Sequence, residues 1–298
     1  MAKPAFYSFA LFAAVAAIVF RFSVHITITS PLLSDLWSPA PVTSNNEEPL
    51  VASTDVKVLS YNPFIAHVAN LVSPAEREYL IQLSKPMMER STVLYANGSK
   101  MLSEERTSST AYLPTTDSVV QTIFRRAAEF QGYVDIGRLD MQVTSYQQGQ
   151  QYRPHWDWFL EPNRTTNRLS TFFAITAKYN GYRPPATYVG RTPLTYWQLE
   201  ADCENCGTQF PKIRADWSQR DQRWCEIVDC SQEVLTTRNI PGGAVFWRNL
   251  DNEGKGRDDV LHAGLPALNG SKIGLNIWTD VDLDRFKASK EGSTVLRP

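Results

Sequence analysis

The sequence predicts an α+β fold in which two helices precede a largely antiparallel β region. Helical patterns occur early, over 74–84 and again after Asp117. Beyond Gly132, short runs of alternating or β-branched residues are separated by Gly, Pro and Asn, which is typical of strands joined by turns. Helices followed by a series of strands, without βα alternation, indicate this class. The clearest strand runs are 139–146, 168–176, 243–247 and 272–279.

The N-terminal segment is predicted to be a membrane anchor. Ala5 to Phe20 carries no charge and is flanked by Lys3 and Arg21. Its sixteen residues fall between the ~7–15 of a signal-peptide core and the ~20 of a membrane-spanning helix. Because no small-x-small cleavage site follows Phe20, we favour a signal anchor over 1–28, with a cleaved signal peptide and secretion as the alternative. Both place the remainder in the secretory pathway.

Residues 29–55 are predicted to be a disordered stalk, because four prolines lie there among Ser, Thr, Asn and Glu. The folded domain is expected to span 56–298. Sequons at Asn97, Asn163 and Asn269 agree with a lumenal glycoprotein.

The two helices have clear start and stop signals. Ser73-Pro74-Ala75-Glu76 predicts an N-cap with a capping box, and Pro86 ends that helix near Ser84. After Asp117, apolar residues recur at helical spacing until Gly132, which is expected to end the second helix. These residues are Val120, Ile123, Phe124, Ala127 and Phe130.

A metal site is suggested by two of the four histidines. His155 and Asp157 form a His-x-Asp pair, and alternate residues of a strand point to the same face. His262 is the only other histidine in the C-terminal half. Two histidines and one carboxylate form a facial triad that leaves metal positions open, which suits non-haem Fe(II) oxygenases. A zinc hydrolase could use the same ligands with a general base nearby.

Lys272 favours the iron interpretation. It lies ten residues after His262, in a strand whose alternation places Lys272, Gly274, Asn276 and Trp278 on one face and Ile273, Leu275 and Ile277 on the other. The second face is expected to be core. An inward ammonium is costly unless an anion binds it, although a lysine at a strand end can also snorkel to solvent.

These residues resemble the iron and co-substrate residues of the Fe(II)/2-oxoglutarate dioxygenases. The chain around them resembles the catalytic domain of prolyl 4-hydroxylase alpha subunits, in a short membrane-anchored form, over about residues 60 to 282. Arg106-Thr107-Ser108 resembles the substrate-lid region. The other matching stretches are 146–157, Arg168 with 171–173, 207–211, 241–247, 262–266 and 270–272.

The resemblance implies a double-stranded β-helix (jelly-roll) core with N-terminal supporting helices. It implies that His155, Asp157 and His262 hold Fe(II) and that Lys272 pairs with the distal carboxylate of 2-oxoglutarate. Tyr146 and Thr208 match residues that hydrogen-bond the co-substrate, and Trp278 matches an aromatic near the site; Tyr146 and Trp278 also have a plain packing interpretation. These three complete the expected cofactor-binding set.

The implied activity is that of a procollagen-proline 4-dioxygenase-like enzyme. It would hydroxylate proline in a peptide or protein with Fe(II), O₂ and 2-oxoglutarate, releasing succinate and CO₂, with L-ascorbate rescuing uncoupled turnovers. The expected location is the endoplasmic reticulum membrane, with the catalytic domain in the lumen. Two alternatives stay open: a 2-oxoglutarate hydroxylase of another residue or a small molecule, and a membrane-tethered binding protein with a degenerate site.

The chain departs from the family pattern in two places. All four cysteines, Cys203, Cys206, Cys225 and Cys230, are close together, and a lumenal location favours two disulfides over a structural zinc, with connectivity open. Cys206 stands where the family usually has Gly, which could shift Thr208. Residues 177–201 form an atypical aromatic insertion. That insertion is either a lid near the substrate groove or a retained intron.

Charge and composition exclude other classes. Lys plus Arg is 30 and Asp plus Glu is 31, giving a net charge of −1, which argues against a nucleic-acid binder. With 43% apolar and 20% charged residues the chain is not wholly disordered, and four cysteines in 298 residues are too few for a disulfide-built miniprotein. The sequence does not indicate an oligomeric state.

Overall fold

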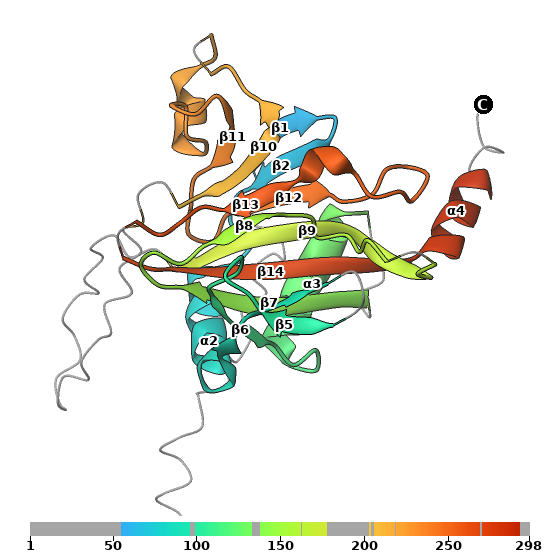
Figure 1. Cartoon of the computed structure of the whole chain (residues 1–298), viewed down its shortest axis with the longest axis horizontal. Coiled ribbons are helices and arrows are strands. Elements are labelled where there is room, and N and C mark those ends of the chain that lie inside the picture. Colours follow the sequence, from blue (N-terminus) through green and yellow to red (C-terminus); the bar gives the residue numbers. More distant parts are fainter. Residues whose placement is uncertain are drawn as a thin grey trace, which may run out of the picture. The chain divides into compact units, whose positions relative to one another are not determined.

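Figure 1 shows the fold of the chain in a computed structural model. The expected anchor (1–28), the expected stalk up to residue 54 and the atypical insertion beyond Ala177 lie outside the described residues. So do Asn97 and Asn269 of the sequons. No helix in the described part of the chain is long and apolar enough to cross a membrane. The described residues are 55–95, 99–132, 138–161, 163–177, 203, 206–217, 219–268 and 270–292.

Both predicted helices form where their caps predict. Helix α2 (Pro74–Ser84) begins after Ser73, whose hydroxyl accepts from the Glu76 amide, while the Glu76 carboxylate accepts from the Ser73 amide at 2.7 Å. Helix α3 (Ser118–Phe130) begins after Asp117, which accepts from two amides of the first turn. Gly132 follows with φ +83°, a conformation that favours glycine. A third helix, α4 (Leu283–Gly292), was not predicted.

In the described part of the chain, two antiparallel sheets and a hairpin make up the β region. The large sheet has eight strands in the order β1-β2-β12-β9-β14-β7-β6-β3, and the small sheet has four in the order β11-β10-β13-β8. Strands β4 and β5 form the separate hairpin. The four predicted strand runs are confirmed as β7, β9, β12 and β14. The strand bounds are β1 Val56–Tyr61, β2 Phe64–Val68, β3 Glu89–Arg90, β4 Thr92–Leu94, β5 Lys100–Leu102, β6 Ser109–Tyr112, β7 Leu139–Tyr146, β8 Tyr152–His155, β9 Thr166–Ala177, β10 Thr208–Arg214, β11 Val234–Thr237, β12 Ala244–Arg248, β13 His262–Gly264 and β14 Lys272–Asp282.

The large sheet lies between helices α2 and α3 on one side and the small sheet on the other (Figure 1). On β9, Phe172 packs in the core shared with α2 and α3, whereas its neighbour Phe173 packs in the core shared with the small sheet. Alternate residues of a strand point to opposite faces, so each central strand serves both cores. The predicted α+β class with a mostly antiparallel β region is confirmed, and two facing antiparallel sheets are consistent with the expected jelly roll.

The predicted alternation of β14 is also confirmed. Leu275 and Ile277 belong to the core on the helix side. Asn276 and Trp278 line a pocket between the two sheets. This space between the sheets is where the candidate site lies.

Candidate functional site

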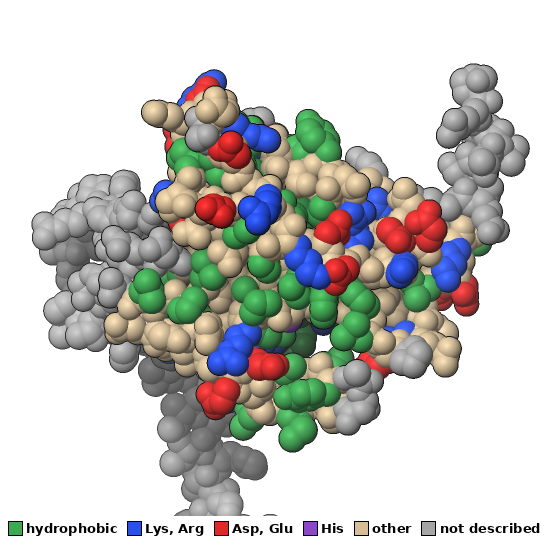
Figure 2. Space-filling model, turned by 45° about the horizontal axis from the view of Figure 1, so that its top comes forward, with side chains coloured by type: hydrophobic (Ala, Val, Ile, Leu, Met, Phe, Trp, Pro, Cys, Tyr) green, Lys and Arg blue, Asp and Glu red, His purple; other side chains and the backbone are tan. Residues whose placement is uncertain are grey.

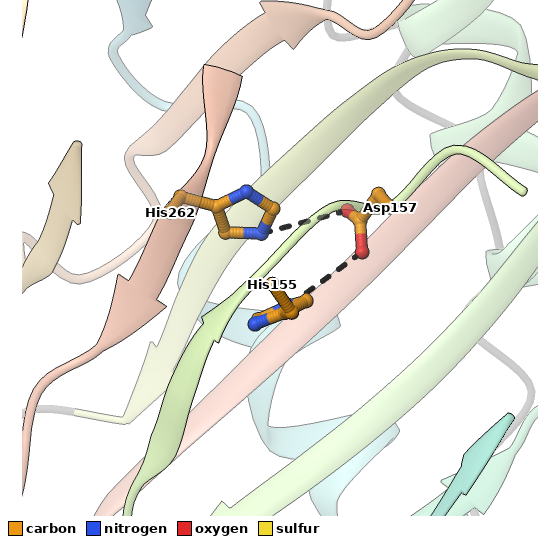
Figure 3. A group of neighbouring side chains, drawn as sticks. All are labelled: His155, Asp157 and His262. Carbon is orange, nitrogen blue, oxygen red and sulfur yellow. Dashed lines mark ion pairs between the residues drawn. The ribbon is translucent and has the colours of Figure 1, made fainter. Parts of the chain in front are cut away.

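His155, Asp157 and His262 meet between the two sheets (Figure 3). His155 ends β8 and His262 begins β13, and the antiparallel register places them opposite each other. Asp157 lies 3.7 Å from His155 (Oδ1 to Nε2) and 3.8 Å from His262 (Oδ2 to Nε2). One correction follows: β8 ends at His155, so Asp157 reaches the site from the bend after the strand and not through strand alternation.

Backbone carbonyls fix the orientation of both imidazole rings. His155 donates from Nδ1 to the Arg153 carbonyl at 2.8 Å, and His262 does the same to the Val260 carbonyl at 3.0 Å. A carbonyl can only accept, so Nδ1 carries the proton and Nε2 keeps its lone pair. Both Nε2 atoms are therefore ready to bind a metal, as in known histidine metal sites.

The charge states of the site also suit a metal. Burial and, to a smaller extent, the neighbouring His262 together lower the pKa of His155 to about 3. Burial opposes ionisation of Asp157, but His262, His155 and Arg168 together with the Thr171 hydroxyl hold its pKa down to about 2. At neutral pH the site therefore offers a neutral His155 ring and a carboxylate. Two histidines and a carboxylate are the donor set of non-haem Fe(II) enzymes.

The group opens into one pocket of about 370 Å³, part of which is open to solvent. Figure 2 shows a hollow near the centre of one face, with hydrophobic side chains along much of its rim. The predicted residues Tyr146, Thr208 and Trp278 all line the pocket with the triad. The other lining residues are Arg106, Tyr152, Phe173, Trp247, Gly264 and Asn276.

Lys272 is buried behind the lining residues Tyr146 and Gly264 of this pocket, with 1% of its surface exposed. Its Nζ donates to the Cys206 carbonyl at 2.5 Å and to the Leu265 carbonyl at 3.2 Å, and lies 4.7 Å from the centre of the Tyr146 ring. Burial lowers the pKa of Lys272 to about 7. The alternative of a lysine snorkelling to solvent is therefore wrong.

Gly264 keeps the space beside Lys272 open. A Cβ added at Gly264 would lie 3.7 Å from Lys272 Nζ and 3.6 Å from the Tyr146 hydroxyl. Within the described residues, carbonyls and an aromatic ring contact the ammonium and no carboxylate forms an ion pair with it. A small carboxylate ligand beside Gly264 would supply the missing negative charge.

The cysteines form two local disulfides, Cys203–Cys206 and Cys225–Cys230. The expectation of two disulfides is confirmed, and the zinc alternative is wrong. Thr208 still lines the pocket, so the cysteine at position 206 does not displace it. The Cys206 carbonyl also contacts Lys272, which the sequence did not indicate.

Sequence reasoning missed two contacts of the pocket. Arg106 was noted only for its likeness to a lid region, yet it is buried, donates to the Gln142 side chain at 2.8 Å and lies 4.8 Å above the Tyr152 ring. Tyr152 in turn stacks on His155, with ring centres 3.4 Å apart. Arg106 precedes a run of Ser and Thr, and no periodicity there identifies an inward arginine.

Comparison with known proteins gives related sequences but no matching family model. Prolyl 4-hydroxylase 5 of Arabidopsis thaliana is 29% identical over 242 residues, covering 80% of this chain and 76% of the relative. The human prolyl 4-hydroxylase subunit alpha-3 is 28% identical, covering 79% of this chain and 37% of the relative. Among solved structures, the viral collagen prolyl hydroxylase of Paramecium Bursaria Chlorella virus-1 in a 2OG complex has 20% identity and a TM-score of 0.47, covering 73% of this chain and 96% of that one.

Proposed function

We propose that this chain, a homologue of the prolyl 4-hydroxylases, is an Fe(II)- and 2-oxoglutarate-dependent dioxygenase that hydroxylates proline in peptides. One observation carries the proposal. The oriented group of His155, Asp157 and His262 opens into a pocket, and the buried ammonium of Lys272 lies next to Tyr146 and Gly264, two residues that line this pocket. The fold that we propose for the core is the double-stranded β-helix.

Each part of the site has a role in this reaction. His155, Asp157 and His262 hold Fe(II), which with O₂ and 2-oxoglutarate supplies the oxidising power for hydroxylation. Lys272 binds the distal carboxylate of 2-oxoglutarate, and Tyr146 and Thr208 hydrogen-bond the same molecule. L-ascorbate is the expected reductant after uncoupled turnovers.

Apolar side chains protect the reaction from water. Phe173, Trp247 and Trp278 line the pocket and are each at most 7% exposed. A water-poor pocket strengthens the attraction between Lys272 and a carboxylate. It also limits side reactions of the activated site.

An exposed apolar hairpin that is linked to the pocket supports a peptide substrate. The β4–β5 hairpin exposes Met101 and Leu102, which are 57% and 65% exposed. Arg106 joins this hairpin to the site, because its guanidinium donates to the Thr92 carbonyl of β4 while its side chain also lines the pocket. Exposed apolar surface of this kind can mark an interaction site, so we propose that the hairpin contacts the peptide substrate.

The proposed function predicts a defined product. Incubation of the full chain with Fe(II), 2-oxoglutarate and proline-rich peptides should give succinate and add the mass of one oxygen atom to a proline. Mass mapping of the peptides and a succinate assay measure this result, with a heat-inactivated sample as control. Succinate with the oxygen on another residue or on no peptide supports the other hydroxylase hypothesis, and no succinate supports the degenerate binding protein.

We further propose an endoplasmic reticulum membrane location, with 1–28 as the anchor and the catalytic domain in the lumen. Asn163 supports this proposal, because its sequon lies at an exposed turn where φ is +64° and the amide is accessible. Expression in a eukaryotic cell should give a chain protected from protease in intact microsomes and shortened in apparent mass by a glycosidase. An Asn163→Gln control should lose part of that mass change. Digestion of the untreated microsomal chain contradicts the lumenal location.

A further inference from the structure

We infer that Thr171 and Asn249 are positioning residues that fix the carboxylate of Asp157 for metal binding. This inference rests on the proposed function, since it concerns the same site. Neither residue reaches the pocket, and neither contacts a histidine of the triad through a hydrogen bond recorded among the described residues. They act through Asp157.

Two donors hold one oxygen of the carboxylate. Asp157 Oδ2 accepts from the Thr171 hydroxyl at 2.8 Å and from the Trp278 indole N–H at 3.0 Å. All three side chains are buried. Oδ1 receives neither of these bonds, so its lone pairs stay available on the side of His155. The arrangement favours a carboxylate that binds a metal through Oδ1 alone.

Asn249 fixes the direction in which the Thr171 hydroxyl donates. The Asn249 amide nitrogen donates to Thr171 Oγ1 at 2.9 Å. A hydroxyl has one hydrogen, and an ionised carboxylate can only accept, so Thr171 gives its hydrogen to Asp157. The opposite amide orientation would place the Asn249 carbonyl oxygen 2.9 Å from Thr171 Oγ1, whose only hydrogen is already donated to Asp157. A fully buried Asn249 is held by its own backbone bonds to Leu169 and Arg257, at 2.8 Å each.

The network joins the two sheets at the metal site. His155 and His262 belong to strands of the small sheet. Thr171 of β9 and Trp278 of β14 belong to the large sheet, where they are direct cross-strand partners. The two hydrogen bonds to Asp157 therefore set its position relative to the histidines. Outer partners of metal ligands of this kind are worth about 10- to 100-fold in metal affinity.

The test measures metal affinity without turnover. Purified full chain is titrated with Co(II) in the absence of 2-oxoglutarate, and the dissociation constant and the visible absorption of bound cobalt are recorded. Thr171→Val keeps the shape and removes the hydroxyl, so we expect Co(II) to bind about 10- to 100-fold more weakly, with an altered cobalt spectrum. Thr171→Ser keeps the hydroxyl and should restore affinity close to wild type.

The control is a second buried threonine on the same strand. Thr176 donates its hydroxyl to the Ile273 carbonyl at 3.0 Å and does not contact Asp157. Thr176→Val therefore loses a comparable hydrogen bond and should leave the affinity for Co(II) unchanged. Trp278→Phe removes the other donor to Asp157 Oδ2 and gives an independent measurement if Thr171→Val does not fold.

A double-mutant cycle tests the role of Asn249. Asn249→Leu should weaken Co(II) binding in the wild-type background and have little further effect in the Thr171→Val background, because the route through the hydroxyl is already lost. Additive effects overturn the assigned role of Asn249. Equal Co(II) affinity of wild type, Thr171→Val and Trp278→Phe overturns the inference while leaving the proposed function in place. A wild-type chain that binds no Co(II) overturns both.

Discussion

We expect the His262→Ala variant to show no Fe(II)-dependent turnover of 2-oxoglutarate above background. His262 supplies one of the two Nε2 donors and faces Asp157 across the site at 3.8 Å. It is 4% exposed and lies on β13 opposite His155, so no other described histidine can take its place. His155→Ala should have the same effect, because a facial site with two remaining protein ligands holds Fe(II) poorly.

The loss of turnover should result from lost metal binding and not from unfolding of the protein. His262→Ala should keep a cooperative thermal transition while losing Co(II) binding. His67 is the matched control: it is also a buried histidine, 5% exposed, and lies on β2 outside the triad. His67→Ala should retain Fe(II)-dependent succinate production. Full activity in either His155→Ala or His262→Ala would falsify the assignment of these residues as iron ligands.

Local signals in the sequence were sufficient for helices α2 and α3, for strands β7, β9, β12 and β14, and for the site residues with distinctive chemistry. The start of α2 is encoded by Ser73 and Glu76 alone, which form its capping box. The two faces of β14 are encoded by the alternation within the strand. Both elements can therefore be predicted without tertiary information. Lys272 was identifiable because it lies on the strand face opposite the apolar residues Ile273, Leu275 and Ile277, where an inward ammonium needs an anion. His155 and His262 are far apart in the sequence, and the resemblance to a known family indicated that they belong to one site.

The remaining contacts depend on register between distant strands. Thr171 of β9 is the cross-strand partner of Trp278 of β14, and both donate to the same oxygen of Asp157. This register is set by the pairing of the whole sheet and not by either strand alone. Asn249 follows an apolar strand, where a polar residue is ordinary, and its bond to Thr171 spans 78 residues. The disulfide pattern shows the same limit, because four cysteines allow three connectivities and the sequence does not choose among them.

Replacing Lys272 with methionine should raise the KM for 2-oxoglutarate at least tenfold, with a smaller change in kcat. A charged hydrogen bond contributes about 1.5–3 kcal/mol, which corresponds to tenfold or more in binding. Iron ligation should be unaffected, because Lys272 donates to the Cys206 and Leu265 carbonyls and not to a residue of the triad. Steady-state kinetics over a range of 2-oxoglutarate concentrations separate the two parameters. A fall in kcat with unchanged KM contradicts this role.

The pH dependence gives a second and sharper test of Lys272. Its pKa is lowered to about 7, whereas burial raises the pKa of the neighbouring Tyr146, so the lysine titrates in the neutral range and the tyrosine does not. A dicarboxylate favours the charged lysine, so the wild-type KM for 2-oxoglutarate should rise above pH 7, by up to about tenfold per unit. Lys272→Met should lack this rise.

The same titration affects stability with a sign that can be worked out. Lys272 has a folded pKa of about 7 and an ordinary value of 10.5 in the unfolded chain. Between these values the unfolded chain binds the extra proton, so the free energy of unfolding contributed by this group rises with pH across that window. The wild type should therefore gain stability relative to Lys272→Met as pH rises from about 7 toward 10.5. The free energy of unfolding of both chains is measured by denaturant unfolding at several pH values across this window. An equal change with pH in the wild type and in Lys272→Met would contradict a buried lysine that loses its proton readily.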